Sequence, residues 1–169
     1  MSRPVLADAF GHHVWATTTL IDACQQLDAD QLATTVPGTY GSVIDTMRHL
    51  VGADASYLFV LSGGQVAAID EAEMDLVALR AVMAAHAPVW QTLVAGDLDA
   101  ELTVVRHRDD GSEGHAPLGI RVAQVLHHGT DHRSQICTAL TSLGITPPEI
   151  DVWDFASHDG RLKEVPAPA

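Results

Sequence analysis

Long segments of apolar residues at helical spacing, separated by short breaks containing Pro or Gly, constrain the fold more than any other feature of this sequence. Within residues 4–28, 42–61, 70–95 and 117–143, apolar side chains recur every three or four positions. That spacing places them on one face of a helix. Helices of this length must bury their apolar faces against one another. The pattern therefore predicts an all-α four-helix bundle.

Residues at the breaks mark where these helices begin and how they are connected. Ser42 is a suitable N-cap for the second helix, and Pro117 suits the first turn of the fourth. Pro88 lies inside the third helix and predicts a kink. The connection between the third and fourth helices is long. Its β-branched run 103–105 and turn-like pair 110–111 predict a short β-hairpin or an irregular excursion.

The length of the chain, 169 residues, is sufficient for one domain with a sizeable core. We expect residues 1–160 to form this single domain and residues 161–169 to be a flexible tail. Residues 146–155, which follow the fourth helix, are expected to be extended and packed through Trp153 and Phe155.

The charge and composition exclude several classes of partner. The net charge is −13 with histidine neutral, and such a surface repels phosphate backbones, so we expect no nucleic-acid partner. The sequence lacks the run of about 18 apolar residues that a membrane span needs. Cys24 and Cys137 do not form a Cys-x-x-Cys pair, and the N-terminus lacks the apolar core of a secretory signal. A cytoplasmic location is therefore expected.

A group of histidines in the fourth helix suggests a metal site. His128 and His132 are four residues apart, so they lie on one face of the helix and can point at one ion. His127 points about 100° away from His128 and does not easily join them. A pair of boundary histidines with no ligand remains the alternative.

Two imidazoles bind an ion poorly, so a third ligand is needed from another element. The best candidate is His49 in the second helix, whose face also carries Asp45, Gly52 and Ser56. Small and polar neighbours leave room for a cleft, and they are equally consistent with a plain exposed face.

Two segments carry a resemblance to a known family. The segments "TMRHLVGADASYL" and "QVLHHGTDHRSQI" resemble the DinB/YfiT-like superfamily of bacterial metal-binding four-helix bundles. The late family motif, approximately His-x-x-x-His-Arg-Gly-Gln, corresponds to residues 128–135, with Ser134 in place of the glycine. The histidine of the family's second helix matches His49, and "HHVWATTTLIDAC" is similar to its first helix. The resemblance covers residues 8–143.

The resemblance implies a divalent ion held by His49, His128 and His132, with water completing the site. It also implies a homodimer, and in some relatives the use of low-molecular-weight thiols. Three neutral imidazoles leave one coordination position open, where water or a thiol can lose its proton and become a nucleophile. Zinc and nickel both suit imidazole ligands.

Several other polar residues are candidates for supporting roles. Asp45, Asp131 and Gln135 are candidates for orienting the metal ligands through their free ring nitrogens. His13, in the first helix, is a candidate general base or substrate contact, and a boundary histidine is the alternative. Arg133 is expected to anchor the fourth helix to an acidic neighbour or a loop carbonyl.

Most of the remaining histidines have simpler expected roles. His86 falls on the apolar face of the third helix and is expected to be a hydrogen-bonded core residue. His127 is expected to lie on the helix surface or to pack there. The others are expected at the surface: His12, His107, His115 and His158.

The sequence leaves three functional classes open. The first is a metal-dependent transferase or hydrolase that acts on a small molecule, with a thiol as a candidate cofactor. The second is a non-catalytic metal-binding or stress-response module, since we find no nucleophile elbow, phosphate-binding loop or clear carboxylate pair. The third is a helical dimer with incidental histidines.

Overall fold

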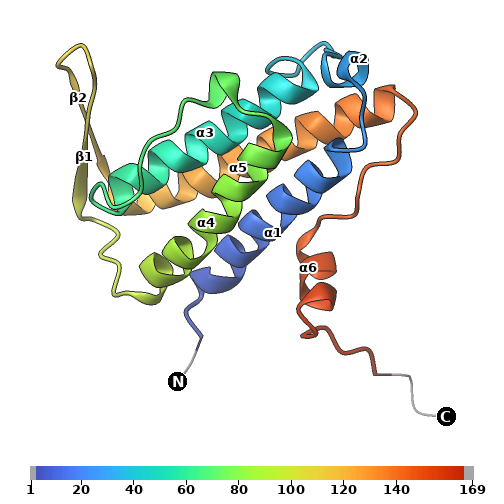
Figure 1. The fold of residues 1–169 in the computed structure, drawn as a ribbon. Helices are drawn as coiled ribbons and strands as arrows, with labels where there is room; N and C mark the ends of the chain where they lie inside the picture. Colours follow the sequence, from blue (N-terminus) through green and yellow to red (C-terminus); the bar gives the residue numbers. More distant parts are fainter. Residues whose placement is uncertain (1–2, 166–169) are drawn as a thin grey trace.

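Four long helices form the body of the protein. The structure is a computed structural model that describes residues 3–165. Helices α1 (Leu6–Cys24), α3 (Val43–Leu61), α4 (Leu76–Ala95) and α5 (Leu118–Ser142) pack side by side (Figure 1). Helix α1 lies along α4, and α3 lies along α5; contacts of α3 with α4 and of α1 with α5 close the bundle. The predicted all-α four-helix bundle is confirmed.

The apolar core is divided into two clusters, with polar side chains between them. One cluster joins the C-terminal halves of α1 and α5 to the N-terminal halves of α3 and α4, and it contains Leu20, Met47 and Leu79. The other lies toward the opposite ends of these helices and contains Phe10 and Trp90. The helices follow the apolar spacing of the sequence because only that arrangement removes both clusters from water.

The connection between α4 and α5 contains a β-hairpin, as predicted. Strands β1 (Thr103–His107) and β2 (Glu113–Pro117) pair antiparallel. The side chain of Arg121 on α5 donates to backbone carbonyls of both strands, Val104 O at 3.0 Å and Gly114 O at 2.7 Å. These bonds hold the hairpin against α5, and strand β1 also contacts α3.

Two predicted boundaries were wrong. Helix α1 ends at Cys24, and the next residues form a separate helix, α2 (Ala29–Leu32), which Asp28 caps. Helix α4 begins at Leu76 rather than at residue 70, because Asp75 caps it, and η1 (Glu71–Glu73) precedes it.

The segment after α5 is partly helical, where an extended segment was expected. Helix α6 (Val152–His158) begins there because the Asp151 side chain accepts hydrogen bonds from two backbone N–H groups in its first turn. Phe155 is buried as predicted, but Trp153 is 69% exposed and does not pack the segment.

The end of the chain is tied to α1 as far as it is described. Arg161 pairs with Asp8 at 2.8 Å, and residues 161–165 belong to no helix or strand. Residues 166–169 of the expected tail lie outside the described residues. Among the helices of residues 3–165, none has the length and apolar character required to cross a membrane.

Candidate metal centre

Helices α3 and α5 bring three histidines from two distant parts of the sequence together. One nitrogen each of His49, His128 and His132 lie within 4.8 Å of one another. The Nε2 atoms of His49 and His128 are 3.2 Å apart. The predicted meeting of these residues is confirmed, and we call them the three-histidine group.

The spacing of these nitrogens fits a divalent ion. Imidazole nitrogens bind zinc at about 2.0–2.1 Å, so two ligands of one tetrahedral ion lie roughly 3.3 Å apart. The 3.2 Å between the His49 and His128 Nε2 atoms is close to this value. All three nitrogens lie within 4.8 Å of one another, so the group could hold an ion once the side chains draw together around it.

Hydrogen bonds determine which nitrogen of His132 is free to bind. The backbone N–H of Tyr40 donates to Gln135 Oε1 at 2.9 Å, and the Gln135 amide group donates to Asp131 Oδ2 at 3.1 Å. Gln135 Oε1 is thus an acceptor, so His132 Nδ1, 3.1 Å away, must carry the proton. The Nε2 lone pair of His132 is then available to a metal.

Two of the three predicted supporting residues take part in this arrangement. Gln135 contacts a ligand directly, and Asp131 holds Gln135 in place. Asp45 instead accepts a hydrogen bond from the Ser42 hydroxyl at 2.6 Å and pairs with Arg48 at 3.8 Å.

Aromatic rings also restrict the histidines of this group, and no pattern in the sequence pointed clearly to them. Tyr40 stacks on His49 with ring centroids 4.0 Å apart and planes 8° from parallel. Tyr57 meets His128 edge-on, with centroids 5.8 Å apart. Tyr40 lies in an irregular loop, where helical spacing indicates nothing about which way a side chain points.

The environment keeps at least two of the imidazoles neutral. Burial lowers the pKa of His128 to about 4, with His132 and His49 nearby adding to the effect. Burial and His132 also lower the pKa of His49. Since neutral imidazole is the form that binds metal, both side chains are ready to act as ligands at neutral pH.

A cavity opens beside the three-histidine group. It has a volume of about 370 Å³, and its walls include His49, His128, Glu71 and Arg106. A Cβ at Gly52 would overlap the Glu71 carboxylate, so the glycine allows this acid to approach α3 closely. Arg106 comes from β1, so the hairpin forms one wall of the cavity.

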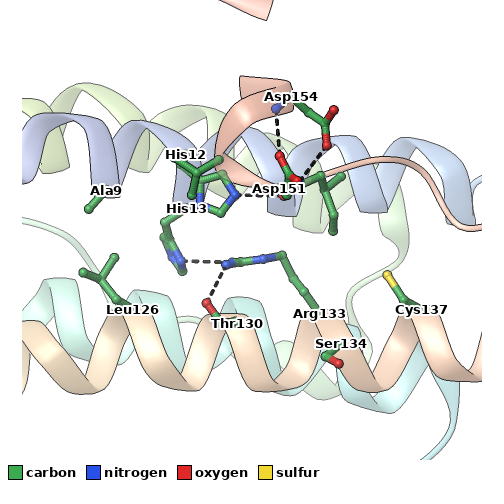
Figure 2. Close-up of a pocket in the computed structure, with 12 residues that line it drawn as sticks. Ala9, His12, His13, Leu126, Thr130, Arg133, Ser134, Cys137, Asp151 and Asp154 are labelled. Carbon is green, nitrogen blue, oxygen red and sulfur yellow. Dashed lines mark hydrogen bonds between the residues drawn. The ribbon is translucent and has the colours of Figure 1, made fainter. Parts of the chain in front are cut away.

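His13, the predicted general base, is not part of the three-histidine group. It lies on α1, only 1% exposed, beside Arg133 (Figure 2). Arg133 Nη1 donates to His13 Nδ1 at 3.2 Å, so the proton of this ring is on Nε2. No observation tests the general-base role, which stays a prediction.

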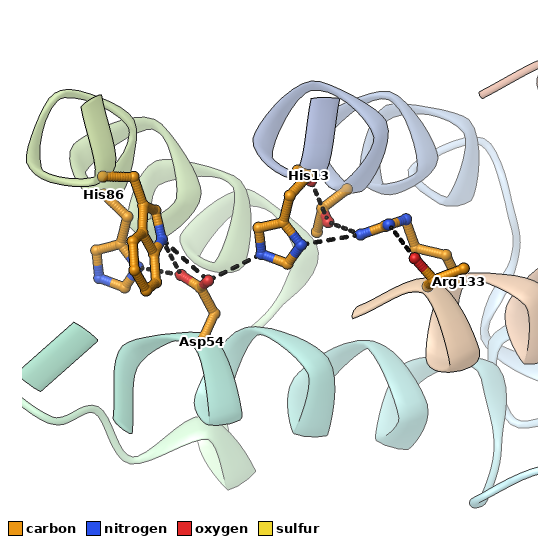
Figure 3. Close-up of polar contacts among 7 residues, drawn as sticks. His13, Asp54, His86 and Arg133 are labelled. Atoms are coloured by element: carbon orange, nitrogen blue, oxygen red, sulfur yellow. Dashed lines mark hydrogen bonds and ion pairs between the residues drawn. The ribbon is translucent and has the colours of Figure 1, made fainter. Parts of the chain in front are cut away.

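The buried side of His13 contacts a carboxylate that sequence reasoning missed. Asp54 Oδ1 lies 2.9 Å from His13 Nε2, and Asp54 Oδ2 lies 2.7 Å from His86 Nδ1 (Figure 3). Trp90 Nε1 donates to the same carboxylate at 3.1 Å. We call these four residues and Arg133 the Asp54 network. A carboxylate on the apolar face of α3 was the sequence signal that could have revealed it.

Hydrogen bonding determines the charge of Asp54. Burial alone would raise its pKa, but the hydrogen bonds from His13 and His86 outweigh that effect and hold the pKa at about 2. The prediction of His86 as a hydrogen-bonded core residue is confirmed.

Arg133 anchors α5 as predicted, but through other partners. Its guanidinium donates to the His13 ring and to the hydroxyls of Thr17 and Thr130, not to an acid or a loop carbonyl.

Four of the five histidines expected at the surface are exposed: His107, His115, His127 and His158. His12 is the exception, since it is partly buried and its Nε2 lies 2.8 Å from the Ile150 carbonyl oxygen.

Comparison with known proteins identifies a family but no individual relative. The sequence model of the DinB family matches residues 1–163. No curated protein matches the chain significantly. The match covers both helices that contribute to the three-histidine group.

Proposed function

Because the chain belongs to the DinB family, we propose that it binds one divalent metal ion through His49, His128 and His132, with an open coordination position. The observation that carries the proposal is the meeting of three imidazole nitrogens within 4.8 Å beside a cavity. The cavity gives a small molecule access to the ion.

We further propose that the protein is a metal-dependent transferase or hydrolase for a small molecule, with a low-molecular-weight thiol as cofactor. A zinc or nickel ion held by three imidazoles supplies a Lewis acid that lowers the pKa of a coordinated water or thiol. Gln135 orients His132, and Tyr40 restricts the ring of His49. Glu71 and Arg106 provide one acidic and one basic group on the cavity wall for contact with a substrate.

Metal binding is tested first, on untagged full-length protein stripped with a chelator and titrated with zinc or nickel. We expect one ion per chain in the wild type and in His127→Ala, and a loss of tight binding in His128→Ala. His127 is a matched control because it is the adjacent histidine on α5 but is exposed and not in the three-histidine group. Less than about a tenth of an ion per chain would mean that the histidines are incidental.

Catalysis is tested next, with the loaded protein, a low-molecular-weight thiol and a panel of epoxides, amides and esters. Turnover that persists in His127→Ala and disappears in His128→Ala supports an enzyme. Stoichiometric metal without turnover on any of these acceptors would favour a non-catalytic metal-binding module. Sedimentation of the same samples tests the homodimer that the family resemblance implies.

A further inference from the structure

A second and larger cavity lies on another side of α5, away from the three-histidine group. Its volume is about 590 Å³, and it is lined by α1, α5 and the start of α6 with the residues just before it (Figure 2). None of its lining residues also lines the cavity beside the three-histidine group. The surface of its walls is mostly carbon, and Ala9, Leu126 and Ile150 contribute to it. A volume in this range is typical of small-molecule sites.

One buried charged side chain, Arg133, faces this apolar space. It is only 4% exposed, and it donates three hydrogen bonds: two from Nη1, to His13 and Thr17, and one from Nη2, to Thr130. A guanidinium has five N–H groups. The N–H of Nε and one N–H of Nη2 therefore have no acceptor among the described residues.

The acceptors that Arg133 does have are all neutral. Asp54 is the acid of the Asp54 network, and the ring of His13 lies between its carboxylate and the Arg133 guanidinium. A guanidinium is a cation at neutral pH. A buried cation with unused donors beside a cavity favours an anionic ligand.

We propose that this cavity binds a monocarboxylate with an apolar tail. The carboxylate accepts the two unused N–H groups of Arg133, and the tail lies against the apolar walls. Charge-assisted, two-pronged hydrogen bonding of this kind is the strong mode of recognition between arginine and carboxylate. Burial of the apolar tail away from water adds to the affinity.

The rim of the cavity limits the ligand to one charge. Asp151 and Asp154 line the cavity and are more exposed than Arg133, and their carboxylates already cap α6. A second carboxylate at the far end of a ligand would lie near these two acids and be repelled. The site should therefore discriminate between a monocarboxylate and the dicarboxylate of equal length.

Calorimetric titration of the full, metal-free chain tests this proposal without involving the metal centre. Octanoate is the probe, octanamide is the neutral probe of the same shape, and octanedioate carries the second charge. We expect octanoate to bind one per chain, and each of the other two to bind at least ~10-fold more weakly. Equal binding of octanoate and octanamide would show that Arg133 recognises no anion, and absence of octanoate binding at millimolar concentration would overturn the site.

Substitutions then place the binding in this cavity. Ser134 is exposed and lines the cavity, so Ser134→Phe should fill it and abolish octanoate binding. Thr138→Phe is the matched control, one turn further along α5, exposed and outside the cavity lining, and it should bind as the wild type does. Unchanged binding in Ser134→Phe would refute the proposal. Arg133→Lys should lose the preference for octanoate over octanamide. If Arg133→Lys does not fold, the result for Ser134→Phe still tests whether octanoate binds in this cavity.

Discussion

Helices α3 and α5 take part in two histidine clusters that differ in almost every other respect. The three-histidine group has no carboxylate among its members, is only partly buried and borders a cavity. The Asp54 network surrounds one fully buried carboxylate with three N–H donors and lies between the two apolar clusters. In the first cluster, lone pairs of neutral imidazoles remain available to an ion. In the second, the Asp54 carboxylate accepts hydrogen bonds from His13, His86 and Trp90.

The contrast shows that neighbouring partners, not residue type, determine what a histidine does. An imidazole that donates to a buried carboxylate stabilises a charge that would otherwise be costly to bury. An imidazole held by an amide oxygen, as His132 is by Gln135, keeps its other nitrogen free for a ligand. We therefore expect substitutions in the Asp54 network to affect folding, and substitutions in the three-histidine group to affect metal binding.

The largest expected effect is that of Asp54→Ala. The substitution leaves the N–H donors of His13, His86 and Trp90 buried without their acceptor, so the free energy of unfolding should fall by about 3–5 kcal/mol. Urea unfolding in the presence of a chelator measures it. His128→Ala, measured in parallel, should change the unfolding free energy by less than about 1 kcal/mol, because His128 is only partly buried. If His128→Ala lowered the free energy of unfolding more than Asp54→Ala does, the assignment of folding to the Asp54 network and of metal binding to the three-histidine group would be wrong.

Metal should stabilise the fold through the three-histidine group alone. At a zinc concentration about 100 times Kd, the free energy of unfolding should rise by about 2.7 kcal/mol, since the ion binds the folded chain. For a domain of this size that corresponds to an increase in Tm of roughly 5–10 °C. Thermal scans should show the shift in wild type and His127→Ala and not in His128→Ala. A shift that survives in His128→Ala would place the ion elsewhere.

The bond from His132 to Gln135 should have a smaller effect, limited to metal affinity. Gln135→Leu removes the acceptor that fixes the His132 ring, so metal affinity should fall by about 10–100-fold. Competition with a chromophoric chelator measures the change. Gln91→Leu, on the exposed face of α4, is the matched control and should bind metal as the wild type does. Equal affinity in both variants would mean that Gln135 does not orient its neighbour.

Much of the fold, and the members of the three-histidine group, could be predicted from the sequence. The spacing of apolar residues predicted four helices, and the spacing of His128 and His132 predicted a shared face. His49 was a candidate from the polar face of its helix, and the family resemblance strengthened it, because helix spacing does not say which faces of two separate helices meet. Tyr40 was missed for a related reason, since its loop has no periodicity.

The Asp54 network was missed because its signal is a single polar residue on an apolar face. Nothing in the sequence relates His13, Asp54, His86 and Trp90, which come from three helices and meet only in the folded protein. The helix at 152–158 was missed, although Asp151 is a suitable N-cap residue; the two prolines before it favour extended backbone only up to that cap.

The smallest expected effect is the fall in the free energy of unfolding at acid pH. The contribution of each cluster should be lost in a different pH range. The pKa of His128 is about 4 in the fold against an ordinary value of 6.5, so below pH 6.5 the unfolded chain binds a proton that the folded chain does not. The contribution of His128 to the stability of metal-free protein is therefore lost as the pH falls from about 6.5 to 4. For Asp54, with a pKa of about 2 against 3.8, the corresponding loss occurs between about pH 3.8 and 2.

Urea unfolding of metal-free protein at pH 7 and pH 5 isolates the contribution of His128. Because the His128 side chain is only partly buried, its contribution to the free energy of unfolding should be less than about 1 kcal/mol. The decrease in unfolding free energy between these pH values should be smaller in His128→Gln than in wild type, because the variant has no group to titrate at that position. His127→Gln, the exposed neighbour, should decrease as the wild type does. If His128→Gln and wild type lost equal stability, the His128 imidazole would not be held neutral by its surroundings, and its readiness to bind metal at neutral pH would need another explanation.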